Sequence, residues 1–219
     1  MAELLLHIGG EKTGTTSLQA FLSKNSRLLM DRYGILYPVS GPLSLNDGHF
    51  PVVSAFLEPE KCAFVPPAKR LAPADVSEAL ADLCRGKKPR LVVLSAEHFS
   101  SRLEKPSIRS LASAIPLPRT RILFYVRRQS DLAVSSFSSA LRSGVRWWLT
   151  ADRVSPDNRF FNHLAVADDW ADVFGRANIE LRAFDKLRAG VEQDYITPNA
   201  LKPPTGLRPG KPRKKKKTM

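Results

Sequence analysis

Three short stretches of the chain, residues 4–8, 90–94 and 121–126, are almost entirely apolar rather than alternating. This pattern is typical of strands that are buried on both faces of a parallel sheet. Shorter or more mixed apolar stretches at 35–38 and 179–184 predict two further strands. We expect residues 4–8 to form a central strand of one parallel sheet.

Between these stretches the apolar residues recur at helical spacing. The predicted helices cover residues 15–33, 50–57, 75–84, 107–114, 160–174 and a segment that begins near Ser130. Gly34, Gly86 and Gly175 mark helix ends, because glycine readily takes the left-handed conformation that stops a helix. Asp75 followed by Glu78 has the spacing of a helix N-cap. Strands alternating with helices predict an α/β protein, with a three-layer α/β/α arrangement around a central parallel sheet.

The chain of 219 residues suits one folded domain with a sizeable core. From residue 197 onward prolines and basic residues dominate, and little remains that could be buried. We therefore predict an α/β domain over residues 1–196 and a disordered basic tail over 197–219. Lys214–Lys217 could form a patch for an anionic surface, although a solvated tail explains the run as well.

Much of the net charge of +13 lies in this tail. From Ala200 onward there are eight Lys or Arg residues and no Asp or Glu, which leaves +5 for residues 1–199. A mildly basic body suits an anionic small-molecule ligand. It gives no reason to expect a specific nucleic-acid partner.

Cys62 and Cys84 lack the spacing of metal ligands, and reduced thiols are typical of cytosolic proteins. The N-terminal apolar run is too short for a signal peptide, and no stretch has the length of a transmembrane helix. We expect a cytoplasmic protein with no transmembrane segment. The sequence has no cluster of Cys, His and carboxylates at metal-binding spacing, so we expect no metal cofactor.

A glycine-rich turn, GGEKTGTTS, follows the first predicted strand over residues 9–17. Glycines let a backbone turn tightly and approach a ligand closely. The free N–H groups and the dipole of the following helix favour an anion at this point. A lysine adds a positive charge, and the hydroxyls add hydrogen-bond donors. The candidate anion-binding residues are Gly10, Lys12, Thr13, Gly14, Thr15, Thr16 and Ser17.

The spacing of Gly9 and Gly14 matches the Walker A loop, G-x-x-x-x-G-K-[ST], but Thr15 stands where that loop has lysine. Here the lysine, Lys12, precedes the second glycine by two residues. The arrangement K-T-G-T-T-S-L after an apolar strand resembles the 5′-phosphosulfate loop of the sulfotransferases that use 3′-phosphoadenosine 5′-phosphosulfate (PAPS). A strand–helix turn without a ligand is the alternative interpretation of this motif alone.

A second segment, YVRRQSDLAVSSF at residues 125–137, has Arg127 at the end of a predicted strand and Ser135 eight residues later. The PAPS-dependent sulfotransferase family has an arginine and a serine at this spacing, and the resemblance implies that they hold the 3′-phosphate of the cofactor. A guanidinium can bind a phosphate through two charge-assisted hydrogen bonds. Residues 170–184 also resemble the late helix–turn–strand of bacterial members. Residues 206–211 match only faintly the basic, glycine-containing loop that closes over the cofactor in the family.

The resemblance implies sulfuryl transfer, with Lys12 stabilising the leaving 5′-phosphate. The acceptor hydroxyl needs a base within hydrogen-bond reach. Glu97 is the first candidate, because it follows the 90–94 strand at the sheet edge where ligands bind in open α/β folds. His98 is the second candidate and His49 the third. Neighbouring residues on an extended chain point to opposite sides, so only one of Glu97 and His98 would face the site. A structural ion pair is the alternative role for Glu97.

Three functions are open from the sequence. The first is a PAPS-dependent sulfotransferase acting on a hydroxyl-bearing acceptor, which could be a carbohydrate, lipid, peptide or small molecule. Trp147 and Trp148 could line its acceptor pocket or pack in the core. The second is a P-loop kinase or NTPase, which predicts a lysine directly after Gly14 and an acidic Mg²⁺ ligand at a strand end. The third is a non-catalytic relative that binds a nucleotide or nothing.

Overall fold

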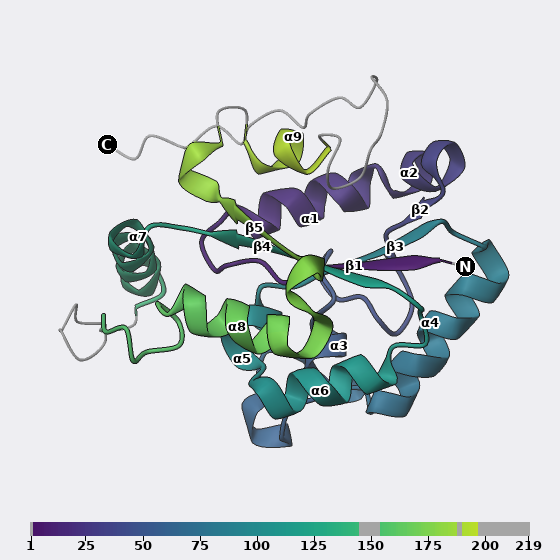
Figure 1. Cartoon of the computed structure of the whole chain (residues 1–219), viewed down its shortest axis with the longest axis horizontal. Coiled ribbons are helices and arrows are strands. Elements are labelled where there is room, and N and C mark those ends of the chain that lie inside the picture. The colour runs from purple at the N-terminus through teal and green to yellow at the C-terminus, as the bar shows by residue number, and fades with distance from the viewer. Residues whose placement is uncertain (1, 145–153, 188–189, 197–219) are drawn as a thin grey trace.

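A computed structural model of the chain describes residues 2–144, 154–187 and 190–196. At its centre lies a five-stranded sheet in the order β2-β3-β1-β4-β5, and every neighbouring pair is parallel (Figure 1). The strands are β1 (Glu3–His7), β2 (Ile35–Leu36), β3 (Leu91–Ser95), β4 (Thr120–Val126) and β5 (Ile179–Ala183). The predicted α/β fold with a central parallel sheet is thus confirmed, and the first apolar stretch supplies its middle strand.

Helices cover both faces of the sheet (Figure 1). On one face lie α1 (Thr15–Lys24), α2 (Ser26–Tyr33) and α9 (Val191–Ile196). On the other lie α3 (Phe50–Ser54), α4 (Pro73–Lys87), α5 (His98–Arg102), α6 (Lys105–Ala114) and α8 (His163–Phe174). Successive strand residues alternate between the two cores, so that Leu4 and Leu6 pack on one face and Leu5 on the other. Four of the strands are largely apolar because both of their faces are covered, whereas the edge strand β5 is mixed, with Glu180 and Arg182 and no buried residue.

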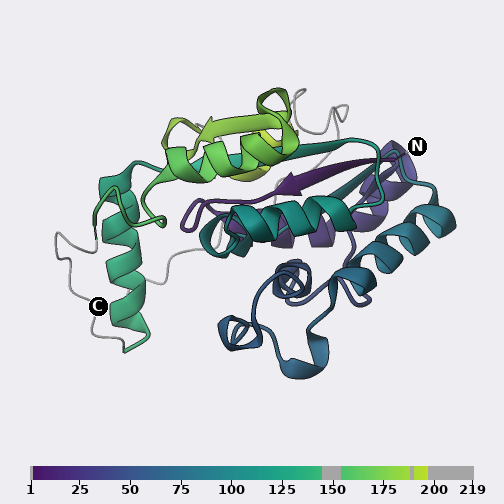
Figure 2. The same cartoon turned by 60° about the horizontal axis from the view of Figure 1, so that its bottom comes forward.

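Helix α7 (Gln129–Arg142) stands apart from these layers and projects away from the end of β4 (Figures 1 and 2). Only Leu132 and Ala133 of this helix are buried, and they form a small separate apolar cluster with Phe161. The outer part of α7 therefore has little of the packing that fixes the other helices.

The predicted single helix over 15–33 is wrong, because two helices meet at Asn25. The side-chain amide of Asn25 donates to the Phe21 carbonyl at 2.8 Å and satisfies an acceptor at the end of α1. The second helix ends at Gly34, which has a φ of 61°, as predicted.

Helix α4 differs from the prediction at both ends. Asp75 is not the N-cap but the third residue of the helix, and its carboxylate accepts the N–H of Ala72, the actual N-cap, at 2.7 Å. The predicted stop at Gly86 is also wrong, since the helix continues through it and ends at Lys88, with a φ of 47°. Terminal hydrogen bonding, which residue type alone does not reveal, decides both ends.

Helix α8 begins later than predicted, at His163, because the Asn162 side chain caps it by accepting the N–H of Ala165 at 2.9 Å. Gly175 ends it as predicted, with a φ of 86°. Helix α9 was not predicted. It buries Val191 in the core that α1 also lines.

Trp147, Trp148 and the tail over 197–219 lie outside the described residues. Cys62 and Cys84 are both free thiols, in line with the expected reduced state. None of the helices within the described ranges has the length and apolar character needed to cross a membrane. The same part of the chain has no group of three or more His, Cys, Asp or Glu side chains arranged to hold a metal ion.

Candidate active site

The glycine-rich turn joins β1 to α1 at the carboxyl edge of the sheet, where its backbone takes an unusual path. Gly9, Lys12 and Gly14 have positive φ angles of 55°, 63° and 75°. A left-handed conformation is costly for a lysine, and such residues cluster at functional sites. Gly14 is the N-cap of α1 and offers no side chain to cap the first turn. The first N–H groups of α1 therefore receive no hydrogen bond from the side chain of their N-cap residue.

Two glycines of this turn allow contacts that no other residue could make. A Cβ at Gly9 would lie 3.2 Å from the Cα of Glu97, and a Cβ at Gly10 would lie 2.5 Å from the carbonyl oxygen of Tyr125. The turn therefore lies between the ends of β3 and β4, and close packing against their backbone restricts its conformation.

The hydroxyl residues of the turn divide into two groups. Thr13 and Thr15 are buried, and their hydroxyls both donate to the Gly10 carbonyl, at 2.6 Å and 3.4 Å. Thr16 and Ser17 are exposed in the first turn of α1. The first pair braces the turn, and the second pair is placed to meet a ligand.

Arg127 lies at the end of β4 and reaches this turn. Its Nη1 donates to the Lys12 carbonyl at 3.1 Å, and its guanidinium lies over the Phe184 ring at 5.7 Å from the centroid. Its Nε lies 3.6 Å from Oδ1 of Asp185, whose other oxygen accepts the N–H of Arg128 at 2.7 Å. The structure therefore brings the two elements singled out in the sequence into direct contact, and it adds Asp185, which the sequence reasoning missed.

Ser135 lies two turns into α7, half-buried. Its carbonyl accepts from the Ser139 hydroxyl at 3.0 Å, but within the described residues its own hydroxyl makes no hydrogen bond. The structure thus links Arg127 to the glycine-rich turn, whereas Ser135 lies on the projecting helix with no described contact to either.

Glu97 follows β3 and sits directly beside the phosphate loop, in contact with Gly9. The side-chain amide of Gln19, on α1, donates to Oε2 of Glu97 at 3.3 Å. Burial raises the pKa of the Glu97 carboxyl, and the neighbouring Glu11 raises it further, while Gln19 and Lys12 oppose this. A carboxyl group with a raised pKa at the carboxyl edge of a parallel sheet is suited to accept a proton from a ligand.

His98 is the first residue of α5, and Glu97 already has helical φ and ψ angles. The expectation of an extended chain here is wrong, so the two side chains do not point to opposite sides. His98 packs edge-on against Phe50 and Phe64, and its Nδ1 lies 3.9 Å from Oε1 of Glu11. Burial, together with a nearby arginine, lowers the pKa of His98 to about 4.

His49 is fully buried, and both of its ring nitrogens are occupied. Nδ1 accepts the N–H of Ser95 at 2.9 Å, which places the ring proton on Nε2, 3.1 Å from the Pro38 carbonyl. Burial lowers the pKa of His49 to about 4, so the ring is neutral at physiological pH. These bonds give His49 a structural role and leave no nitrogen for a substrate.

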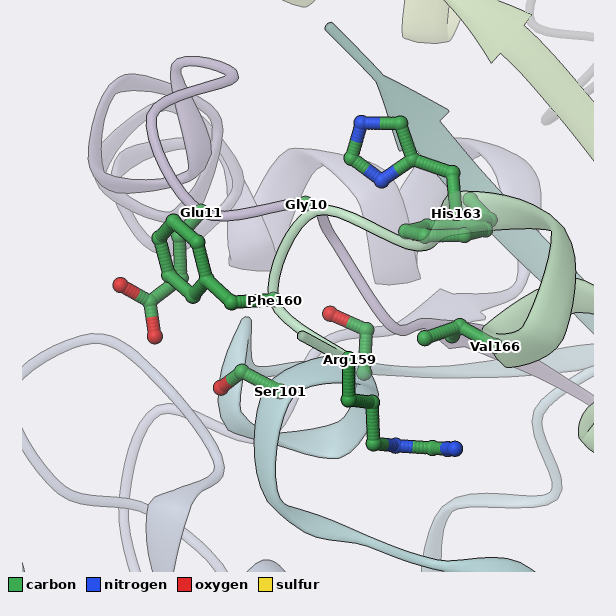
Figure 3. Close-up of a pocket in the computed structure, with 9 residues that line it drawn as sticks. Gly10, Glu11, Ser101, Arg159, Phe160, His163 and Val166 are labelled. Atoms are coloured by element: carbon green, nitrogen blue, oxygen red, sulfur yellow. The ribbon is translucent and has the colours of Figure 1, made fainter. Parts of the chain in front are cut away.

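A small cavity lies between the loop and the start of α8, lined by Gly10, Glu11, Arg159, Phe160 and His163 among others (Figure 3). Its volume of about 10 Å³ is that of roughly one water. A larger cleft of about 290 Å³ opens between the first turns of α7 and α8. His163 lines both hollows, and its Nε2 lies 2.8 Å from the Arg127 carbonyl.

No family model matches this chain, and no curated protein matches it. Among solved structures, a sulfotransferase from Alicyclobacillus acidocaldarius is similar, with a TM-score of 0.51 and 18% sequence identity. The match covers 83% of this chain and 73% of that one. The chain has a sulfotransferase-like fold. At this level of identity the likeness shows the fold alone.

Several residues of this sulfotransferase-like fold escaped the sequence reasoning although they touch the candidate residues, among them Glu11, Asp185, Gln19 and His163. Glu11 lies inside the glycine-rich turn. An acidic residue among candidate anion-binding residues is unusual, and this was a signal that the sequence offered. Asp185 and Gln19 gave no comparable signal, because one follows β5 and the other looks like an ordinary polar position of a helix. Only the fold shows that they contact Arg127 and Glu97.

Proposed function

We propose that this protein is a PAPS-dependent sulfotransferase that transfers a sulfuryl group to a hydroxyl-bearing acceptor. The observation that carries the proposal is the contact between Arg127 and the carbonyl of Lys12. This contact brings the guanidinium of Arg127 close to the N-terminus of α1, which has no side-chain cap. One compact ligand with two anionic groups can therefore bind the guanidinium with one group and the helix N–H groups with the other. A 3′,5′-bisphosphorylated nucleoside is such a ligand.

In this proposal the 5′-phosphosulfate lies in the loop. The N–H groups from Gly10 to Ser17, the side chain of Lys12 and the hydroxyls of Thr16 and Ser17 contact it. Buried Thr13 and Thr15 hold the loop in shape. Arg127 and Ser135 bind the 3′-phosphate. The sulfotransferase-like fold supports the proposed type of reaction.

The chemical step needs a base for the acceptor. The acceptor oxygen attacks sulfur while the bond from sulfur to the 5′-phosphate oxygen breaks, and the acceptor proton passes to Glu97. Lys12 neutralises the charge that grows on the departing phosphate. The raised pKa of Glu97 and its place beside Gly9 favour it over His98, whose ring is held between two phenylalanines.

The acceptor class in this proposal is a carbohydrate, lipid, peptide or small molecule with a free hydroxyl. No metal is assigned a role in the step. A cytoplasmic location is part of the proposal and is supported by the free thiols of Cys62 and Cys84.

Calorimetric titration of the full chain with 3′-phosphoadenosine 5′-phosphate, beside ATP with Mg²⁺, tests the cofactor. We expect the bisphosphate to bind and ATP to bind more weakly or not at all, because Thr15 replaces the lysine that a Walker A loop needs. Preference for ATP would support a kinase or NTPase instead. Binding of neither nucleotide would support a non-catalytic relative.

A further inference from the structure

Gln19 is a polar residue in the part of α1 that faces the sheet, where its neighbours Leu18 and Leu22 are fully buried. Only 3% of Gln19 is exposed. A buried amide is costly unless its hydrogen bonds are made. Its Nε2 has three acceptors within reach: the Ser95 carbonyl at 3.3 Å, the Ser95 hydroxyl at 3.4 Å and Oε2 of Glu97 at 3.3 Å.

Ser95 provides a fixed anchor for this amide. It is fully buried, its hydroxyl lies 2.8 Å from Nδ1 of His7, and its N–H donates to His49 at 2.9 Å. Both histidines are themselves fully buried. Gln19 is therefore fixed by its contacts with Ser95 at the end of β3. Its amide fixes the position of the Glu97 carboxylate in the same way.

We propose that Gln19 is a positioning residue for Glu97: anchored on Ser95, its amide donates to Oε2 and keeps the carboxylate ionised beside the phosphate loop. An amide NH₂ has two protons, so one can go to the Ser95 carbonyl and the other to Glu97. Since an N–H donor stabilises a carboxylate more than a neutral carboxyl, this contact favours the form that can act as a base. The catalytic meaning of the inference rests on the proposed function, but the contact itself does not.

Several groups besides Gln19 face Glu97. Glu11 and Lys12 approach from the loop, Tyr37 approaches from the end of β2, and His98 follows directly in α5. Glu11 raises the pKa of Glu97, whereas Gln19 and Lys12 lower it. Gln19 and Glu11 therefore shift the pKa of Glu97 in opposite directions. Removal of the Gln19 amide should raise this pKa, and removal of the Glu11 charge should lower it.

The test uses Gln19→Met, which keeps the length of the side chain and removes the donor, and Glu11→Gln, which removes the opposing charge. The readout is the titration of Glu97 in the full chain, followed by carbon NMR of the carboxyl and assigned with Glu97→Gln. We expect the pKa of Glu97 to rise in Gln19→Met, because the variant loses a hydrogen bond that favours the carboxylate. In Glu11→Gln we expect it to fall.

Gln19→Asn, whose amide is one methylene shorter, is the second variant and is expected to raise the pKa in the same direction. Gln129→Leu, at an exposed position of α7, is the matched control and should leave the titration unchanged. An unchanged Glu97 titration in both Gln19 variants would overturn the inference.

Activity gives a separate readout. If the protein transfers sulfuryl groups, the acid limb of the kcat profile should move to higher pH in Gln19→Met by the same amount as the NMR titration. A protein that binds no bisphosphate would refute the proposed function while leaving the NMR result intact. A shifted NMR titration without a shifted kcat profile would show that Glu97 is not the base.

Discussion

The glycine-rich loop over residues 9–17 and the Arg127 corner of this protein are built in different ways, although they touch. By the Arg127 corner we mean Arg127, Arg128 and Asp185. The loop is made by the backbone: three left-handed residues, two close approaches at Gly9 and Gly10, and an open first turn of α1. The corner is made by side chains, and its guanidinium already has an anionic partner in Asp185.

This difference shows which kinds of change each region tolerates. The loop depends on glycine, because a Cβ at Gly10 would meet the Tyr125 carbonyl oxygen and the positive φ angles of Gly9 and Gly14 disfavour other residues. The corner depends on charge and hydrogen-bond geometry, and its side chains bond two backbone groups, the Lys12 carbonyl and the Arg128 N–H. Three substitutions separate the two regions, and they are ordered here by expected effect.

Lys12→Ala removes the one cationic side chain of the loop and should have the largest effect. We expect kcat for sulfuryl transfer to fall by about 10²- to 10³-fold, the typical cost of losing one group that stabilises transition-state charge. Initial rates with PAPS and an acceptor found by screening provide the measurement. Lys24→Ala, at the far end of α1, is the control. Equal activity of the two variants would mean that the loop works through its backbone alone.

Arg127→Ala should weaken 3′-phosphate binding and leave the 5′ site nearly intact. Loss of a charge-assisted hydrogen bond costs about 1.5–3 kcal/mol, roughly ten- to a hundredfold in Kd. Calorimetry with 3′-phosphoadenosine 5′-phosphate and with adenosine 5′-phosphate separates the two sites, because only the first ligand has the 3′-phosphate. Arg127→Lys should recover part of the affinity.

A similar loss with both ligands would contradict this assignment. It would show that Arg127 acts mainly by holding the Lys12 carbonyl, so that the corner supports the loop and does not contact the nucleotide itself.

Gly14→Ala should have the smallest effect of the three substitutions, and the property that it changes is the stability of the fold. Gly14 has a φ of 75°, and a Cβ there would lie 3.1 Å from Cγ1 of Val191. We expect the free energy of unfolding to fall by about 1–2 kcal/mol, the cost of a left-handed alanine. Gly86→Ala is the matched control, since Gly86 lies inside α4 with no neighbour near its missing Cβ. It should raise the stability by about 0.5–1 kcal/mol.

Urea unfolding of both glycine variants gives the measurement. A rise in stability in Gly14→Ala would mean that residue 14 of the variant leaves the left-handed conformation and that Val191 moves to admit the new Cβ. In that case the loop would be less firmly braced than its contacts indicate.

Much of the fold could be predicted from local patterns. All five strands of the sheet were predicted within a few residues. Strands buried on both faces carry a strong apolar signal, and the more exposed β5 was predicted from a mixed apolar stretch. Helix ends were predicted less well. Asp75 and Gly86 were misplaced, since a helix end depends on which terminal N–H and carbonyl groups find partners.

The sequence by itself determined the α/β fold and the place of the glycine-rich turn, because both follow from short-range rules: apolar periodicity, glycine, and the open turn of a helix. Only the tertiary structure decided which side chains meet there. It joined Arg127 to Lys12, brought Asp185 to Arg127 and Gln19 to Glu97, and enclosed His49. These contacts form between segments far apart in the chain, and a parallel sheet brings such segments together only after its strands have paired.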